Sequence, residues 1–482
     1  MNHAFSAETF EAEALRYQQR RQSHWRAVAS STSRSWGAYY HQRLHITYRQ
    51  LVPVGATVLE IGCGGGDLLA ALEPAVGVGV DFCPEALATA RAAHPSLIFL
   101  HAEAHHLALE ARTFDYIILS DLVNDLWDVQ AMLSGLQAYC APHTRIILNC
   151  HRHLWNIPLR IAQTVGIATP NLPQNWLTRH DLINLLEITG FQCLQGWNEI
   201  IAPVALPLGA DFANRYLAKI WPFYALGLAN FMVARPLQKP LCANPTVSVI
   251  VAARNEAGHI EELLARIPEM GGGTDIIFVE GNSTDDTFAT IQRCIAAHPE
   301  RRCQLIKQTG KGKGDAVRLG FEQATGDILM ILDADITVPP EDLPRFYALL
   351  TNGAAEFVNG VRLVYPMADD AMRFLNLLGN KFFSWAFSWL LGQPIRDTLC
   401  GTKVLWRSGY QRIAEQRAYF GEFDPFGDFD LLFGAARLNL KILEVPIRYR
   451  ARRYGETNIS RWRHGWLLLK MVVFAARRIK FR

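Results

Sequence analysis

Two acidic residues, Asp333 and Asp335, stand at the end of a strongly apolar stretch that begins at Ile328. A short apolar stretch of this kind is typical of a buried strand. Carboxylates two positions apart at a strand end point to the same side. Because Mg²⁺ and Mn²⁺ prefer carboxylate ligands together with phosphate oxygens, we predict that this acid pair holds one of these ions beside a phosphorylated ligand.

Polar and cationic side chains precede this acid pair in an orderly succession. A glycine-rich turn with two lysines, from Gly310 to Asp315, opens a helical stretch but lacks the GxxxxGK[ST] pattern of a P-loop. Other polar groups follow the apolar stretches 247–253 and 274–279, at the edge where parallel strands bind ligands. The candidates for binding a sugar nucleotide are Arg254, Asn255, Glu256, Glu280, Lys313, Asp333 and Asp335.

The N-terminal half carries a second candidate site, in which glycines cluster where a strand turns into a helix. The spacing of Gly62, Gly64 and Gly66 is GxGxG, which differs from the GxGxxG of dinucleotide-binding folds. Glu60, just before the loop, suits the cationic amino-acid end of S-adenosylmethionine better than it suits a pyrophosphate. Asp81 ends the next predicted strand, where a carboxylate can accept hydrogen bonds from ribose hydroxyls.

Both sets of residues require parallel sheets to position them. Apolar strands alternate with helical patterns from about residue 56 to 150, and again from residue 247 onward, which predicts two α/β domains. Between them, residues 235–246 hold three prolines and no periodicity. We therefore predict a first domain over residues 1–235, a linker over 236–246 and a second domain over 247–482.

Composition and charge support this organisation. A chain of 482 residues is too long for one core, and 50% hydrophobic with 19% charged residues is typical of globular protein. The net charge of +3 is uneven, since residues 441–482 hold 12 Lys and Arg against two acids. The nine cysteines form no CxxC pair, the first residues lack a signal-peptide core, and no uncharged apolar run reaches membrane-spanning length. We expect a cytoplasmic protein without a nucleic-acid partner.

The first domain resembles the class I S-adenosylmethionine-dependent methyltransferases over roughly residues 35–200. The resemblance is carried by VLEIGCGGGDLL, from Val58, and VGVDFCPEALATAR, from Val78. It implies a Rossmann-like sheet, S-adenosylmethionine as cofactor, and methyl transfer. The implied cofactor-binding residues are Glu60, Gly62, Gly64, Gly66, Asp81 and Glu103.

The second domain resembles the family 2 glycosyltransferases of GT-A fold, most closely the dolichol-phosphate mannosyltransferase-like branch, over residues 246–465. AARNEAGHI, GNSTDDT, GKGKGDAVRLGF, LDAD, DTLCGTKV, LEVPIRY and YGETNIS match the family motifs in order. The resemblance implies contacts to the nucleoside from Asn255, Glu256 and Glu280, metal binding by Asp333 and Asp335, and an approach of Arg362 to the diphosphate. Arg452, Arg453 and Thr457 then belong to a cationic lid that binds the acceptor.

The same resemblance implies inverting transfer by a single displacement. A hydroxyl acceptor needs a carboxylate base, for which Asp397, Asp428 and Asp430 are the candidates. A phosphate monoester needs none, because it is already nucleophilic at neutral pH. The arginines of residues 448–463 favour a polyprenyl or other lipid phosphate as acceptor. The alternative is transfer to a soluble or polysaccharide hydroxyl, with a degenerate methyltransferase domain that serves as a binding scaffold.

Two aromatic stretches predict contact with a membrane surface. Residues 372–391 place one polar stripe on an otherwise apolar helix, and residues 464–482 form a short apolar helix that ends in cations. Both are too short or too polar to span a bilayer, but both suit its interface. We expect a bifunctional enzyme of one pathway, peripheral on the inner face of the membrane, whose partners are a sugar nucleotide and a lipid phosphate or glycan acceptor.

Overall fold

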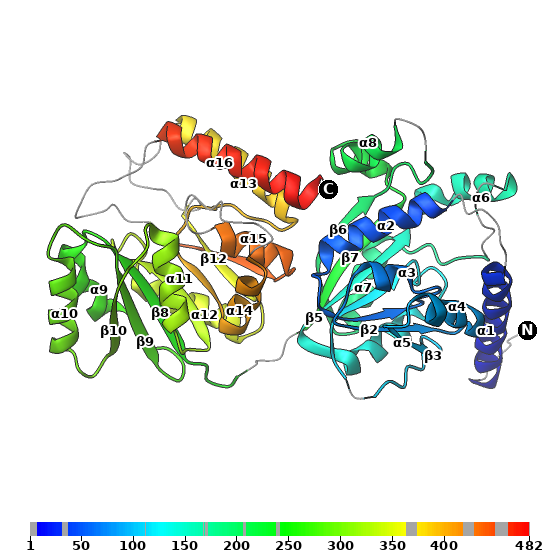
Figure 1. Cartoon of the computed structure of the whole chain (residues 1–482), viewed down its shortest axis with the longest axis horizontal. Coiled ribbons are helices and arrows are strands. Elements are labelled where there is room, and N and C mark those ends of the chain that lie inside the picture. Colours follow the sequence, from blue (N-terminus) through cyan, green and yellow to red (C-terminus); the bar gives the residue numbers. More distant parts are fainter. Residues whose placement is uncertain are drawn as a thin grey trace, which may run out of the picture. The chain divides into compact units, whose positions relative to one another are not determined.

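The computed structural model describes residues 7–30, 37–110, 112–166, 168, 172–205, 209–237, 242–362, 374–417, 429–448 and 461–481 (Figure 1). Four of the predicted site residues, Asp428, Arg452, Arg453 and Thr457, lie outside this part of the chain. Internal contacts divide the chain into two compact units, Met1–Leu237 with Phe481–Arg482, and Gln238–Lys480. Each unit is an α/β fold, which confirms the predicted fold class.

The first unit is built on a seven-stranded sheet of order β3-β2-β1-β4-β5-β7-β6. The strands from β1 to β5 run parallel, and β7 is antiparallel to both of its neighbours. The carboxyl ends of the five parallel strands therefore meet at one edge. The strands are β1 Thr57–Ile61, β2 Val76–Asp81, β3 Ile98–His101, β4 Phe114–Ser120, β5 Cys140–His151, β6 Phe191–Glu199 and β7 Ala229–Pro236.

Helices cover both faces of this sheet, because successive side chains of each strand point to opposite sides. Val58 of β1 packs in one core cluster with Tyr48 of α2, and Leu59 packs in the other with Leu186 of α7. The helices are α1 Ala7–Ser30, α2 Ala38–Leu51, α3 Asp67–Ala71, α4 Pro84–Ala93, α5 Val129–Gly135, α6 Asn156–Thr164, α7 Arg179–Ile188 and α8 Ala210–Arg215.

The second unit has its own seven-stranded sheet, of order β10-β9-β8-β11-β13-β12-β14. Four strands at one side, β8 to β11, are parallel, and β13 runs antiparallel between β11 and β12. The predicted strand before Asp333 is β11, and it is buried throughout its apolar part. The strands are β8 Val247–Ala253, β9 Thr274–Glu280, β10 Arg302–Lys307, β11 Ile328–Asp333, β12 Phe357–Val361, β13 Lys403–Trp406 and β14 Ile442–Pro446.

The helices of this unit also form two layers. Ile250 of β8 packs with Val317 of α11, while Val249 packs on the other face with Leu263 of α9. The helices are α9 Ile260–Arg266, α10 Thr287–Ala297, α11 Lys313–Gln323, α12 Leu343–Thr351, α13 Phe374–Leu391, α14 Arg407–Glu415, α15 Phe429–Arg437 and α16 Arg461–Ala475.

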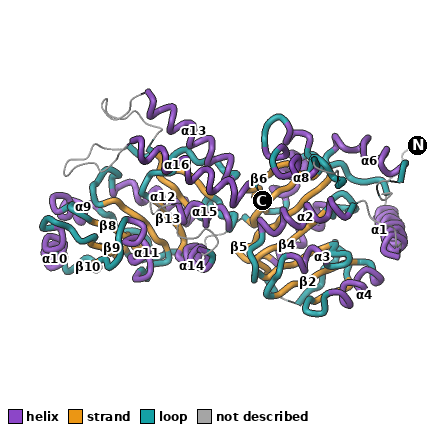
Figure 2. Tube along the Cα trace, turned by 45° about the horizontal axis from the view of Figure 1, so that its top comes forward, coloured by secondary structure: helices purple, strands orange, loops and turns teal. Residues whose placement is uncertain are grey.

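The two aromatic stretches become α13 and α16, which lie side by side (Figures 1 and 2). Phe387 of α13 and Met471 of α16 are fully buried in one core cluster, so that one face of each helix packs on the unit itself. Other side chains of these helices remain exposed. Within the described residues, no helix combines the length and the apolar character needed to cross a membrane.

Candidate active sites

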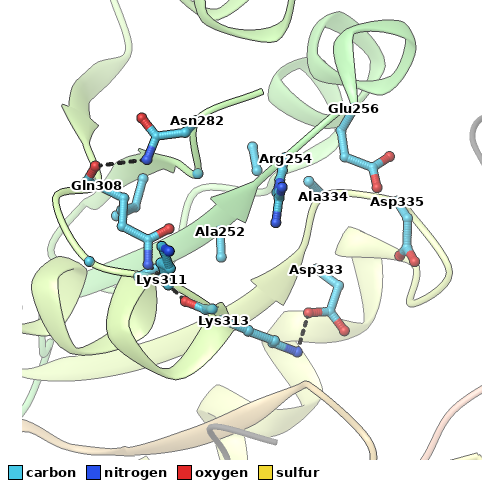
Figure 3. Close-up of a pocket in the computed structure, with 16 residues that line it drawn as sticks. Ala252, Arg254, Glu256, Asn282, Gln308, Lys311, Lys313, Asp333, Ala334 and Asp335 are labelled. Carbon is cyan, nitrogen blue, oxygen red and sulfur yellow. Dashed lines mark hydrogen bonds and ion pairs between the residues drawn. The ribbon is translucent and has the colours of Figure 1, made fainter. Parts of the chain in front are cut away.

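The second unit has a cavity of about 720 Å³ at the carboxyl ends of β8 and β11 (Figure 3). From β8 the chain passes to β9 and β10 on one side, and it then returns to place β11 on the other side. A parallel sheet binds ligands where its strand order reverses in this way. The charged side chains that line the cavity are Arg254, Glu256, Lys311, Lys313, Asp333 and Asp335.

The acid pair and one lysine of the glycine-rich turn meet in this cavity. Lys313 Nζ lies 2.5 Å from Asp333 Oδ1, and Figure 3 shows the lysine reaching across to the carboxylate. Asp335 Oδ1 accepts hydrogen bonds from the backbone N–H and the hydroxyl of Thr337, at 3.1 and 2.7 Å. The glycine-rich turn therefore supplies a cation to the acid pair as well as to the cavity.

The pKa values of the two carboxyl groups shift in opposite directions. Burial favours the neutral form of Asp333, but the charge and hydrogen bond of Lys313 outweigh it, so the pKa of Asp333 lies below its ordinary value. Burial and the neighbouring Asp333 raise the pKa of Asp335. An additional cation at this position would favour the ionised form of both groups.

The acid pair suits a divalent cation that arrives with phosphate. Among the described residues, no three His, Cys, Asp or Glu side chains cluster in a way that could hold a metal ion. Mg²⁺ commonly binds through one or two carboxylates plus the phosphates of its substrate and needs no complete protein cage. Asp333 and Asp335 fit that mode and would hold such an ion together with diphosphate and water ligands.

Two neighbours of the acid pair, Gly401 and Lys403, were not predicted from the sequence as site residues. A Cβ atom on Gly401 would collide with the Asp333 carboxylate and Lys313 Nζ, so a larger residue there would displace this ion pair. Lys403 is fully buried and its Nζ donates to the Cys400 carbonyl at 2.6 Å. The local signal was the motif DTLCGTKV, but its distance of about 70 residues from Asp333 concealed the contact.

The predicted nucleoside contacts divide into two groups. Arg254 and Glu256 line the cavity, and Glu256 Oε2 lies 2.9 Å from His259 Nδ1. Asn255 and Glu280 instead brace the loops at the strand ends. The Asn255 side-chain carbonyl accepts from the Thr284 backbone at 2.8 Å, and the Glu280 carboxylate accepts from the Ser283 backbone at 2.5 Å.

Arg362 and Asp397 form a tight pair at the end of β12. Arg362 Nε and Nη2 donate to the two carboxylate oxygens at 2.7 and 2.8 Å, and the Arg362 backbone N–H donates at 3.1 Å. Burial favours the neutral form of Asp397, but Arg362 outweighs it and lowers the pKa of this carboxyl. A carboxylate bound in this way is a weak base and is better suited to orienting Arg362.

Asp430, another candidate base, lies on α15. Its carboxylate is 3.4 Å from Arg417 Nε, and its side chain is largely buried. Like Asp397, Asp430 is therefore engaged in an ion pair with an arginine. The assignment of a catalytic base to Asp397, Asp428 or Asp430 therefore stays a prediction, and the two described acids are both held by arginines.

In the first unit, the glycine-rich loop follows β1 as the sequence predicts. Gly62, Gly64 and Gly66 have φ of 75°, 51° and 78°, in the left-handed region that glycine adopts without strain. The Gly64 N–H donates to Asp81 Oδ2 at 2.9 Å, and the Cys83 N–H donates to Oδ1 at 2.8 Å. The Asp81 carboxylate thus fixes the loop, while each oxygen keeps a further lone pair for a ribose hydroxyl.

Glu60 is buried beneath this loop with one carboxyl oxygen, Oε2, that has no hydrogen-bond partner in the described structure. Burial raises the pKa of Glu60 to about 8. The group is therefore largely neutral at pH 7. A buried acceptor without a partner is costly and suits a ligand that brings a donor or a positive charge.

Glu103, the remaining predicted cofactor contact, forms hydrogen bonds with the nearby His105. Its carboxylate oxygens lie 2.7 Å from His105 Nδ1 and from the His105 backbone nitrogen. Burial favours the neutral form of Glu103, but these hydrogen bonds outweigh it and lower the pKa. Its part in cofactor binding remains a prediction.

Asp121 is the centre of a polar network at the end of β4. Its carboxylate accepts from the Tyr40 hydroxyl at 3.0 and 3.1 Å and from the Asn149 amide at 2.5 Å. His151 Nε2 lies 3.7 Å away. Leu122 contacts the position where Gly62 would carry a Cβ, so the network borders the glycine-rich loop.

Each unit thus has one candidate site at the carboxyl edge of its parallel strands. Comparison with known families identifies both domains. Residues 248–419 match the glycosyl transferase family 2 model, and residues 58–143 match a methyltransferase domain model. The chain carries a family 2 glycosyltransferase domain fused to a methyltransferase domain, as the motifs predicted.

Curated relatives match the glycosyltransferase half. The dolichol-phosphate mannosyltransferase of Pyrococcus furiosus is 28% identical over 220 residues, which cover 44% of this chain and 59% of that enzyme. The dolichyl-phosphate hexose transferase of Haloferax volcanii is 29% identical over 230 residues, which cover 47% of this chain and 92% of that enzyme.

Among solved structures, glucosyl-3-phosphoglycerate synthase from Mycobacterium tuberculosis with Mn²⁺ and uridine diphosphate covers 50% of this chain and 82% of its own. The two sequences are 21% identical and the TM-score is 0.37, a similarity too low to support an inference about function.

Proposed function

We propose that the second unit transfers a sugar from a nucleoside diphosphate sugar to a lipid phosphate, and that the first unit transfers a methyl group from S-adenosylmethionine in the same pathway. The observation that carries the first part is the cavity at the strand-order reversal, where an acid pair faces three cations, Arg254, Lys311 and Lys313. Such a cavity complements a diphosphate with a bound divalent cation.

Around this cavity, we assign each group a role by its charge. Arg254 and Glu256 would bind the nucleoside. Lys313 would supply positive charge where the diphosphate departs, as would Arg362, whose charge acts on Asp333 from outside the cavity lining. Mg²⁺ or Mn²⁺, held by Asp333 and Asp335, would add Lewis-acid stabilisation of the leaving group. Asp397 acts as a positioning residue, because its two carboxylate oxygens accept hydrogen bonds from Nε and Nη2 of Arg362.

Two observations support a phosphate acceptor. The described candidate bases, Asp397 and Asp430, are paired with arginines, and a phosphate acceptor needs no base. The names of the two curated relatives include dolichol or dolichyl phosphate. The lid arginines Arg452 and Arg453 remain part of the proposal, although they lie outside the described residues.

The exposed faces of α13 and α16 support a position at the membrane surface. Trp385 and Trp466 are 66% and 59% exposed. Lys470 Nζ lies 5.7 Å from the Trp466 ring, and Lys480 Nζ lies 5.8 Å from the Trp389 ring. Aromatic rings beside flexible cations suit the headgroup region, where rings partition and cations reach lipid phosphates.

The proposed transfer is tested in two steps. A thermal-shift panel of nucleoside diphosphates with Mn²⁺ identifies the donor base, since a ligand that binds the folded state raises the unfolding temperature. Radiolabelled donor sugar is then offered to polyprenyl phosphate in vesicles and, separately, to soluble glycans. Transfer to the lipid phosphate is expected, while transfer to glycans alone would move a hydroxyl acceptor to first place.

Lys313→Met is expected to change metal and nucleotide binding in opposite directions. The Lys313 ammonium and a divalent cation compete for Asp333. Removal of the ammonium should therefore increase the affinity for Mn²⁺ in the absence of nucleotide by about tenfold. Loss of a charge from the cavity should weaken nucleoside diphosphate binding by about tenfold. Calorimetry measures both constants.

Lys311→Met is the matched control, because it removes the same charge from the same turn. We expect it to weaken nucleotide binding and to leave Mn²⁺ binding without nucleotide unchanged. Equal Mn²⁺ affinity in the wild type and in Lys313→Met would contradict the competition.

The first unit fits S-adenosylmethionine at three points. The glycine-rich loop allows close approach of the ligand, Asp81 can accept from the ribose, and the partnerless Glu60 oxygen can receive the ammonium group. The cofactor, when bound, supplies an electrophilic methyl group. We assign the polar network around Asp121, which borders the glycine-rich loop, to orienting the methyl acceptor.

Binding of S-adenosylmethionine at pH 7 is expected to release about one proton, because an ammonium beside Glu60 lowers the pKa of a group that is otherwise mostly protonated. Above the folded pKa of about 8, the release should vanish, since the carboxylate is already ionised. Calorimetry in buffers of different ionisation enthalpy counts the protons.

Glu60→Gln should bind the cofactor without proton release, and it serves as the control for this measurement. Release that is unchanged in Glu60→Gln would assign the proton to another group. A folded protein that binds no S-adenosylmethionine would instead support the alternative of a degenerate scaffold.

A further inference from the structure

The helix α6 and the residues that flank it carry an apolar stripe that faces solvent. Leu154, Ile157, Ile161 and Val165 recur at steps of three and four residues, and all are more than half exposed, at 55%, 71%, 59% and 62%. The opposite side of the helix packs on the unit through Leu159, beside Trp155 of the preceding turn. Because a surface helix normally buries its apolar face, this reversed arrangement indicates that something else covers it.

A second exposed apolar segment is tied to this helix. Trp155 Nε1 donates to the Leu226 carbonyl at 2.8 Å, and the Arg152 backbone N–H donates to the Leu228 carbonyl at 2.9 Å. The segment before these carbonyls, residues 212–226, buries Asn214 and Ala218 but exposes most of its large apolar side chains, with Trp221 at 76%. Its other exposed side chains are Phe212, Tyr216, Ile220, Phe223, Tyr224 and Leu226.

The charge around these residues is positive. Residues 151–180 contain no Asp or Glu, and they include Arg152, Arg160 and Arg179. Arg160 on α6 and Arg215 at the end of α8 are exposed. Self-association through a two-fold axis would bring this patch against itself and set cations against cations. An anionic lipid surface complements both the charge and the apolar stripe.

We propose that α6 and residues 212–226 form a membrane-binding surface that belongs to the methyltransferase domain. The apolar stripe and Trp221 enter the headgroup boundary, and the arginines contact lipid phosphates. This surface is separate in sequence from α13 and α16 and is carried by the other unit.

The position of α6 also suggests the class of methyl acceptor. The helix follows the carboxyl end of β5, whose last residue, His151, has its Nε2 3.7 Å from the Asp121 carboxylate. The membrane surface therefore borders the polar network beside the glycine-rich loop. A lipid or lipid-linked molecule could reach the methyltransferase site without leaving the bilayer surface.

The test measures binding of the full chain to phosphatidylcholine vesicles with and without phosphatidylglycerol by co-sedimentation. Ile157→Asp/Ile161→Asp should lower the partition coefficient on anionic vesicles by at least about tenfold. Val54→Asp is the matched control, since Val54 is 68% exposed and precedes the amino end of β1, at the opposite edge of the sheet. It should bind like the wild type.

A second pair of variants distinguishes the contribution of α13 and α16 to vesicle binding from that of α6. Trp466→Asp alone and combined with the α6 substitutions should show two additive losses. Nucleoside diphosphate binding should be unchanged in Ile157→Asp/Ile161→Asp, so that failure of this proposal is distinguishable from failure of the proposed sugar transfer. If the double variant does not fold, Trp221→Ser replaces it.

Three outcomes would overturn the proposal. They are a wild-type chain that does not bind anionic vesicles, a folded α6 variant that binds them like the wild type, and a wild-type dimer that the α6 substitutions dissociate without changing vesicle binding. The last outcome, detected by light scattering, would assign the stripe to a second copy of the chain.

Discussion

Asp333→Asn should lower sugar transfer by about a thousandfold or more, because it removes the anionic ligand of the proposed metal and the partner of Lys313 in one change. The substitution keeps the size of the side chain and leaves the buried strand β11 intact. The Asp335→Asn variant should lose activity to a similar degree. Transfer of radiolabelled sugar at saturating donor measures the effect, and the unfolding temperature verifies the fold.

Asp342→Asn is the matched control for this experiment. Asp342 precedes α12 and pairs with Arg345 at 3.0 Å, away from the residues that line the cavity. Its replacement should leave transfer within about twofold of the wild type, as is usual for an exposed surface pair. Metal-dependent transfer that persists in both Asp333→Asn and Asp335→Asn would remove the metal assignment.

Arg362→Met should destabilise the second unit by about 3–5 kcal/mol, because it leaves the Asp397 carboxylate buried without its cation. The Asp397 side chain is 3% exposed and that of Arg362 is 21% exposed, so solvent screens this pair only weakly. Chemical denaturation, followed in the full chain by a probe placed in the second unit, measures the loss.

A double-mutant cycle tests whether the loss comes from the pair. Arg362→Met/Asp397→Asn should recover part of the stability, since a neutral amide replaces the uncompensated charge while still accepting backbone hydrogen bonds. Additive losses would show that the two side chains act independently.

The stability that the Arg362–Asp397 pair contributes should also depend on pH in a defined direction. The folded pKa of Asp397 lies below its ordinary value of 3.8. Its ionised form therefore contributes stability that is fully present above about pH 4 and is lost as the pH falls through the folded pKa. The difference between wild type and Asp397→Asn should be constant near neutrality and should shrink in acid.

The sequence alone determined the elements and the chemistry carried by neighbouring residues. The alternation of apolar strands and helical patterns defined two α/β domains, because hydrophobic periodicity is a local property of the chain. The acid pair at the end of β11 and the glycine-rich loop after β1 were also recognisable, since each lies within a few residues.

Contacts between distant residues were decided only by the tertiary structure. Lys313 meets Asp333 across 20 positions, Arg362 meets Asp397 across 35, and Tyr40 meets Asp121 across 81. The last two pairings bind Asp397 to Arg362 and make Asp121 the centre of a network. A linear pattern does not specify which strand ends meet, because sheet order sets the distance between residues that are far apart in sequence.

For the amphipathic helix α6, too, the sequence determined the pattern and the tertiary structure decided which face is exposed. The periodicity of α6 is visible in the sequence, and a helix of this pattern ordinarily turns its apolar face to the core. The fold instead packs Leu159 inward and leaves Ile157 and Ile161 in solvent. The sequence determined that an apolar stripe exists, while the packing of β5, α6 and residues 223–228 decided which way it faces, because only the neighbours of a helix define its buried side.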